Sequence, residues 1–216
     1  RPNIPTDTRG EQDMSPQIPD VIDHLVGIEP GSRLDRLRNR RPETRRHAQA
    51  SYEALLSPRS TGAVSASERL AVAAFVAGLH RDAATAEFYA TRLAEHAPRL
   101  APLIAKEVEA GRTAGPYGAY PSPGPLAAES VPGPVFRVAD PDGLGPRLAA
   151  ALEHAHLLVF RPREASRGAL QALLDAGWST TGVVTLSQLV AFLTFQVRVV
   201  CGLRLLAASS GKELES

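Results

Sequence analysis

The stretch Ser65-Ala-Ser-Glu-Arg-Leu-Ala-Val-Ala-Ala-Phe-Val-Ala-Gly-Leu-His80 decides the fold class of this 216-residue chain. Its first four residues match a capping box, in which Ser65 accepts a hydrogen bond from the N–H of Glu68 and the Glu68 carboxylate reaches back to the N–H of Ser65. The residues that follow are almost all apolar and rich in alanine, which favours a helix over a strand. The stretch therefore predicts a capped, very apolar helix that ends near Gly78 or Leu79.

The composition extends this prediction to the whole chain. Apolar residues make up 44% of it and aromatic residues only 5%, and alanine and leucine dominate, which predicts an all-α fold with a substantial core. A net charge of +1 gives no general attraction to nucleic acid or to a membrane. The single cysteine, Cys201, excludes an intramolecular disulfide and a Cys-x-x-Cys motif, and it favours a reducing, cytoplasmic location.

Proline and glycine divide the chain into segments. Residues 114–134 hold six prolines and four glycines, so we expect an extended linker that crosses a surface or reaches toward a neighbouring subunit. It separates an N-terminal helical half, residues 20–113, from a C-terminal half, residues 135–208. Residues 1–19 are expected to form a disordered arm, and residues 209–216 a tail.

Apolar spacing and turn residues place the helices within the two halves. The expected helices cover residues 20–25, 32–39, 42–56, 65–79, 83–94, 98–110, 144–159, 166–176 and 185–207. A second capping-box match, Thr185-x-x-Gln188, sets the start of the last one. Its apolar run is long enough to suggest a membrane span, but polar and charged residues interrupt it, so we expect a buried core helix and no membrane association.

Residues 65–89 resemble the helical signature of the carboxymuconolactone decarboxylase and alkylhydroperoxidase-D-like superfamily, which contains thiol peroxidases. In that superfamily a Glu opens the helix, a Cys-x-x-Cys pair follows about three turns later, and a His comes next. Glu68 matches the Glu, whereas His80 and Ala83 occupy the two Cys positions and Glu87 stands near the family His. The resemblance implies an alkylhydroperoxidase-D-like helical fold of two degenerate halves, without the redox pair of the peroxidases.

The second half resembles the longer, peroxidase-related branch of the same superfamily. Its pattern is Pro162-Arg-Glu, then Ala-Leu-Gln-Ala-Leu-Leu-Asp-Ala-Gly-Trp178, then Phe195-Gln-Val-Arg198-Val-Val-Cys-Gly-Leu203. That branch commonly ends in Asn-Arg-x-x-Asp-Gly-Leu, of which Arg, Gly and Leu are present. The resemblance implies substrate contacts at Trp178 and Arg198. It also implies a homo-oligomer, either a dimer, a trimer or a hexamer.

Two functional hypotheses follow. Neither His80 nor Ala83 can form the thiolate that attacks a peroxide, so we predict no thiol peroxidase turnover. The first hypothesis is non-redox acid–base chemistry at Glu68, His80 and Glu87. The second is a non-catalytic oligomeric partner of a cysteine-containing peroxidase homologue, or a protein that binds a small ligand between its helices. The capping box alone also explains Glu68, and a basic residue at a helix end also explains His80.

Other polar residues have simpler interpretations. Arg198 lies in an apolar helix and needs a carboxylate, either in a structural salt bridge or on a substrate. His154 and His156 are two apart on a helix and point to different faces, so we predict no metal site and no cofactor. Cys201 is expected to be a buried, inert side chain.

The surface residues lead to similar conclusions. The seven arginines of residues 33–46 have no interleaved aromatic residues, so we expect a solvated helix face or a contact with an acidic partner rather than nucleic-acid binding. The remaining histidines, His24, His47 and His96, are expected to face solvent.

Overall fold

The computed structural model describes residues 18–120 and 122–212, and within them the protein is helical and contains no strand. The prediction of an all-α fold is therefore confirmed. The helices are α1 (Val21–Val26), α2 (Arg33–Asn39), α3 (Pro42–Leu56), α4 (Ala66–Leu79), α5 (Ala83–His96), α6 (Ala101–Gly111), α7 (Pro141–Leu144), α8 (Pro146–Phe160), α9 (Arg167–Asp175) and α10 (Thr180–Lys212), with short 3-10 turns η1 (Ala127–Glu129) and η2 (Pro162–Glu164). Most of the expected N-terminal arm lies outside the described residues.

Helix α4 is the centre of the molecule. Every residue from Arg69 to Leu79 is buried, and α4 packs against α3, α5, α6, α8 and α10. The predicted capping box is confirmed: the N–H of Ser65 donates to Glu68 Oε2 at 2.8 Å, and the N–H of Glu68 donates to Ser65 Oγ at 3.2 Å. The buried Arg69 guanidinium donates to three backbone carbonyls, of Leu55 in the last turn of α3 and of Thr61 and Val64 in the loop that follows, so its hydrogen bonds are satisfied without an acid.

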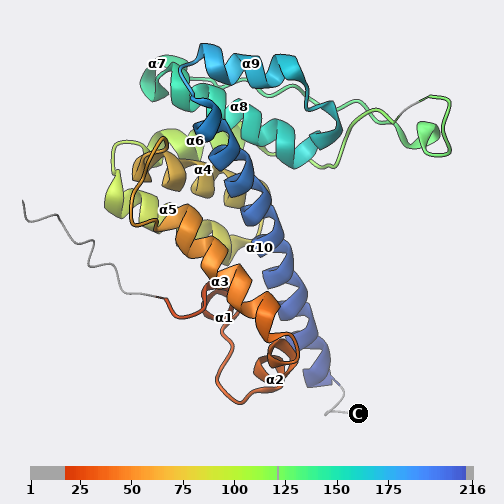
Figure 1. Ribbon diagram of the computed structural model, residues 1–216. Helices are drawn as coiled ribbons and strands as arrows, with labels where there is room; N and C mark the ends of the chain where they lie inside the picture. Colours follow the sequence, from red (N-terminus) through yellow and green to blue (C-terminus); the bar gives the residue numbers. More distant parts are fainter. Residues whose placement is uncertain (1–17, 121, 213–216) are drawn as a thin grey trace, which may run out of the picture.

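Helix α10 spans the length of the bundle, from the end formed by α7–α9 to the end formed by α1 and α2 (Figure 1). It begins at Thr180, five residues before the predicted start, so the Thr185-x-x-Gln188 capping box is wrong. Thr185 lies inside the helix, where its hydroxyl donates to the carbonyl of Thr181. Ser179 takes the capping role, since its Oγ accepts from the N–H of Gly182 at 3.1 Å.

The two faces of α10 differ in exposure. Leu186, Leu189 and Leu193 are fully buried against the rest of the bundle, whereas Val184 and Phe195 are exposed. The expectation of a buried core helix is therefore correct for one face only. Within the described residues, one helical stretch, Thr180–Ser209, is long and apolar enough to cross a membrane, and 39% of its most apolar window is buried inside the protein.

Two of the clustered arginines have a structural role. Arg38 and Arg45 form ion pairs with Asp20 and Asp23 at the start of α1, and Arg45 also pairs with Asp35 at 2.8 Å. These contacts join α1, α2 and α3. The expectation of a solvated arginine face is therefore wrong for these two side chains, because acidic residues from two other helices surround them.

The Pro- and Gly-rich segment forms an arm that projects from the bundle (Figure 1). At its base the N–H of Tyr117 donates to the carbonyl of Phe160, and Gly118 pairs with Val131 in an isolated antiparallel bridge. Among the described residues of this segment, the regular structure consists of η1 and this bridge, as expected of an extended linker rich in proline and glycine.

Candidate functional site

Glu68 belongs to a junction between helices. Its Oε1 accepts from Arg147 Nε at 2.6 Å, in addition to the capping box with Ser65. The other guanidinium nitrogens of Arg147 donate to the carbonyls of Gly177 and Ala63, at 2.6 and 2.7 Å. Burial acts to raise the pKa of Glu68, but the hydrogen bonds from Arg147 and Ser65 outweigh it and hold that pKa below its usual value. Glu68 is therefore an ionised structural anchor in this arrangement.

Trp178 is part of the same junction. It is 3% exposed, and its indole N–H donates to the carbonyl of Arg147 at 2.9 Å. The Arg147 guanidinium also lies 4.1 Å from the centre of the Trp178 ring, in a cation–π contact. These contacts hold the turn between α9 and α10 against the start of α8. The indole N–H and one face of the Trp178 ring therefore both contact Arg147.

The three predicted catalytic residues do not come together. Glu68 lies in the first turn of α4, whereas His80 caps its C-terminal end, about 18 Å away along an unbroken helix. Glu87 lies on an exposed position of α5. Acid–base roles for these residues stay predictions, but within one chain Glu68 and His80 are too far apart to act on the same reacting group.

His80 instead lies beside Arg198, the other predicted substrate contact. Both line a pocket of about 270 Å³ between the end of α4, the start of the arm and the middle of α10. We call it the His80 pocket; its lining residues are Leu79, His80, Arg81, Thr113, Ala114, Gly115, Pro116, Val159, Phe160 and Arg198. It carries two arginines and no carboxylate, with an apolar wall from α4 and α8.

The hydrogen bonding of His80 defines its chemical state. Its Nδ1 lies 2.8 Å from the carbonyl oxygen of Val76, and only a protonated Nδ1 can donate to that carbonyl. Burial lowers the pKa of His80, and the positive charge of Arg198 lowers it further, while the Val76 contact acts in the opposite direction. The imidazole is therefore neutral near pH 7, with the lone pair on Nε2.

Among the described residues, neither arginine of the His80 pocket forms an ion pair with a carboxylate. Arg198 is exposed and forms no ion pair with any described residue, so the expected structural salt bridge is wrong. Arg204, about two turns further along α10, makes that contact instead, with Asp82 at 2.7 Å. Arg81 and Thr113 line the His80 pocket but are not among the site residues predicted from the sequence. In the sequence, Arg81 is marked only by its position just after the predicted end of α4. In the structure its backbone adopts φ 60°.

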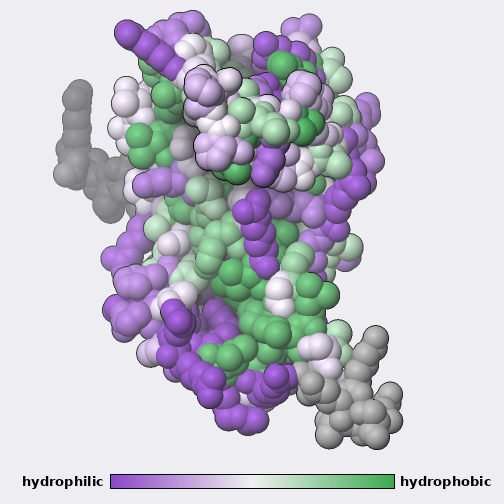
Figure 2. Space-filling view, turned by 90° about the vertical axis from the view of Figure 1, so that its right-hand side faces the viewer, coloured by the Kyte–Doolittle hydropathy of each residue, from purple (hydrophilic) through white to green (hydrophobic). Residues whose placement is uncertain are grey.

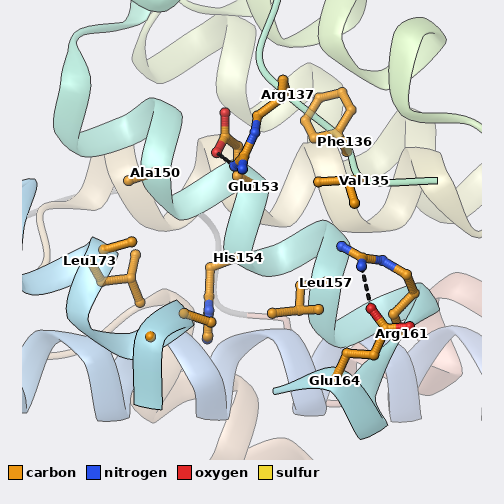
Figure 3. Close-up of a pocket in the computed structure, with 13 residues that line it drawn as sticks. Val135, Phe136, Arg137, Ala150, Glu153, His154, Leu157, Arg161, Glu164 and Leu173 are labelled. Atoms are coloured by element: carbon orange, nitrogen blue, oxygen red, sulfur yellow. Dashed lines mark hydrogen bonds and ion pairs between the residues drawn. The ribbon is translucent and has the colours of Figure 1, made fainter. Parts of the chain in front are cut away.

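A second pocket, of about 350 Å³, lies between α8, α9 and the segment around Phe136 (Figure 3). Its charges neutralise one another, since Arg137 pairs with Glu153 and Arg161 pairs with Glu164 (Figure 3). His154 points from α8 into this region, but both ring nitrogens are buried and accept or donate no hydrogen bond. Neither ring nitrogen is therefore accessible to a ligand from solvent.

The remaining candidates give no catalytic centre. His156 is buried, contacts the Gly111 carbonyl through Nε2 at 3.0 Å and stacks on Phe136. Cys201 is half-buried rather than fully buried, and burial together with the nearby Asp82 raises its pKa, which favours the unreactive thiol. In the described part of the chain, no three His, Cys, Asp or Glu side chains gather as metal ligands.

The other histidines expected in solvent, His24, His47 and His96, are exposed as predicted.

Comparison with known proteins adds no assignment to this geometry. No protein-family model matches the chain, and neither the curated proteins nor the solved structures contain a significant match.

Proposed function

We propose that the protein binds a small carboxylate in the His80 pocket and performs no thiol redox chemistry. The observation that carries this proposal is the charge of the pocket, in which Arg81 and Arg198 flank a space that no carboxylate of the described residues lines. Both arginines are exposed, so their guanidinium groups are accessible to an anion that enters the pocket. A ligand carboxylate accepts two parallel hydrogen bonds from a guanidinium group.

The rest of the pocket favours a ligand with an apolar body. Val159 and Phe160 of α8 and Leu79 of α4 form its apolar side. His80 offers the lone pair of Nε2 to a hydroxyl or amide donor on the ligand, and Thr113 already exchanges a hydrogen bond with Tyr117 at 2.8 Å. An aromatic or aliphatic carboxylate with one further donor satisfies all three features.

The resemblance to the alkylhydroperoxidase-D-like superfamily fits this proposal. The capped helix α4 and the following α5 have the order that the resemblance requires, and we propose that the chain has this fold in two degenerate halves. With one cysteine in the sequence, a peroxidatic and a resolving thiol cannot both be present. The protein then acts in the cytoplasm as a ligand-binding relative, or as a partner of a cysteine-containing homologue.

Titration of the purified protein with benzoate and with 4-hydroxybenzoate, which adds a hydroxyl donor, followed by calorimetry and by ligand-observed NMR, tests the proposal. Benzamide, which has the shape of benzoate without its charge, is the matched control ligand. We expect saturable binding of at least one carboxylate and weaker binding of benzamide, because a charge-assisted hydrogen bond contributes about 1.5–3 kcal/mol, or about tenfold or more in affinity.

Variants locate the site. Arg198→Gln should weaken carboxylate binding by about tenfold or more, whereas Arg137→Gln, which removes an exposed arginine on the other pocket, should leave it unchanged. His80→Gln tests the hydrogen bond from the ligand to His80 Nε2 and leaves the positive charge of the two arginines unchanged. Binding that Arg198→Gln does not change, or no saturable binding of either carboxylate, would show that the His80 pocket has another role.

A further inference from the structure

The outward face of α10 carries a seam of exposed residues at alternating spacings of four and three. These residues are Val184, Gln188, Ala191, Phe195, Arg198, Gly202 and Leu205. Spacings of four and three are those of the a and d positions of a coiled coil, which meet a second helix. The described part of the chain provides no helix that covers this face, so the α10 seam has no partner helix among those residues.

The α10 seam is apolar for most of its length. Val184 is 52% exposed, Phe195 41% and Leu205 72%. Figure 2 shows a broad hydrophobic area on this side of the molecule, below the end formed by α8 and α9. Beside the seam, a groove of about 690 Å³ lies between α10 and the end of α8, with Leu158, Pro162 and Val199 among its lining residues.

The order of residues along the α10 seam is self-complementary for an antiparallel pair. If a two-fold axis passes near Phe195, Val184 of one copy lies opposite Leu205 of the other. In the same register Gln188 lies opposite Gly202, and Ala191 lies opposite Arg198. Each long polar side chain thus faces a small residue. The space at Gly202 is open, since a Cβ built there has no neighbour within 4 Å.

A parallel pair of the same helices is much less favourable. It places Arg198 opposite Arg198, and like charges in contact repel each other. It also pairs Gly202 with Gly202, which leaves a gap in the packing. We infer that a second copy of this chain docks antiparallel along the α10 seam, with Phe195 at the two-fold axis.

The area of contact shows which other parts of the chain must contribute. From Val184 to Leu205 the seam is about 32 Å long, and a face about 10 Å wide then covers about 320 Å² per copy. A stable interface buries about 800 Å² per partner, so the seam alone is too small. The groove beside α10 and the arm, which projects on the α10 side of the bundle in Figure 1, provide further surface for the second copy.

The polar residues of the α10 seam argue against lipid as the occupant. Gln188 and Arg198 lie well inside the apolar stretch, not at its ends. An arginine near the centre of a bilayer costs about 2.5–3.5 kcal/mol on insertion scales. In the antiparallel pair, by contrast, the guanidinium passes the small Ala191 side chain toward the edge of the interface, where it loses only part of its water.

Light scattering after size-exclusion chromatography, at concentrations from micromolar to millimolar, gives the first test. We expect a mass of about 46 kDa, twice the 23.0 kDa of the chain. Phe195→Glu should give the monomer, and Leu174→Glu, at an equally exposed position on α9, should leave the dimer intact. Arg198 is kept in all variants because it also lines the His80 pocket.

Cross-linking tests the register, and it decides the case if Phe195→Glu fails to fold. In a Cys201→Ser background, Gln188→Cys protein is mixed with Gly202→Cys protein and treated with a short bis-maleimide. We expect a covalent dimer from the mixture and almost none from either protein alone. Self-cross-linking of Gly202→Cys would indicate a parallel pair and overturn the proposal. So would a wild-type monomer at millimolar concentration, or a monomer that sediments with phosphatidylcholine and phosphatidylglycerol vesicles.

Discussion

Arg147 is the side chain whose loss should reveal most about how the N-terminal and C-terminal halves of the chain are held together. Its guanidinium donates to Glu68 on α4, to the carbonyl of Ala63 before α4 and to the carbonyl of Gly177 before α10. It also covers the Trp178 ring. We therefore predict that Arg147→Met, which keeps the aliphatic part of the side chain, loosens the contact of α8 with α4 and with the start of α10.

The magnitude follows from the contacts. Hydrogen bonds to a charged group contribute about 1.5–3 kcal/mol, but the Arg147 side chain is 32% exposed, so about 1 kcal/mol for each of the three is appropriate. The cation–π contact adds about 0.5 kcal/mol. Arg147→Met should thus lower the free energy of unfolding by about 3.5 kcal/mol, and Arg147→Lys, which can keep one hydrogen bond, by about 2.5 kcal/mol.

Urea unfolding followed by circular dichroism and by tryptophan fluorescence measures this effect, because Trp178 is the single tryptophan of the chain. The control is Arg137→Met, whose ion pair with Glu153 is largely exposed and should contribute less than about 0.5 kcal/mol. If Arg147→Met costs no more than this control, the three hydrogen bonds do not hold the helices together and the reasoning is refuted.

Two further predictions concern buried positions. Burial lowers the pKa of His154 and His156, so the stability that their neutral forms provide is present above about pH 6.5 and is lost as the pH falls through the folded-state pKa. His154→Leu should weaken this pH dependence, measured by urea unfolding at several pH values. It should also raise the free energy of unfolding at neutral pH by about 1 kcal/mol, because it removes two buried nitrogens without hydrogen-bond partners. A pH profile of stability that is the same as in the wild type would contradict this prediction. Gly78→Ala should destabilise by about 1–3 kcal/mol, since a Cβ there lies 2.6 Å from a methyl group of Val108. At Gly168 on α9 a Cβ meets only Ser166 Oγ, at an ordinary contact distance of 3.9 Å, so Gly168→Ala should stabilise by up to about 1 kcal/mol. Equal effects of the two glycine substitutions in thermal unfolding would show that α4 and α6 can move apart.

Local signals explain what the sequence could predict. Helix α4 can be predicted from its own sequence, because the capping box of Ser65 and Glu68 stands directly before the apolar run that forms the helix. The first residue of α10 cannot be predicted from the helix sequence alone. Ser179 matches the capping motif less well than Thr185 does, yet Ser179 caps the helix because Trp178 is fixed beneath Arg147 in another part of the chain.

The candidate site depends on packing that no local pattern contains. Arg198 and Arg204 lie on the same apolar helix, and both need an anion on sequence grounds. Only the position of Asp82 decides that Arg204 is paired and that Arg198 is not. In the same way, His80 and Arg198 meet because α4 ends where the middle of α10 passes, a contact between segments more than a hundred residues apart.

The shared position of Arg198 in the His80 pocket and on the α10 seam links the two proposals. Docking of a second copy removes water around this guanidinium, and a charge that loses water without a counter-ion is destabilising. A carboxylate in the His80 pocket supplies the counter-ion, so it should favour the dimer, and by linkage the dimer should bind the carboxylate more tightly. Sedimentation equilibrium with and without saturating benzoate should show dimer dissociation reduced by about fivefold, the lower end of typical coupling. Arg198→Gln removes the charge that couples the two events, so in that variant benzoate should leave the dimer unchanged; an equal benzoate effect in the variant and the wild type would mean that ligand and second copy act through different residues.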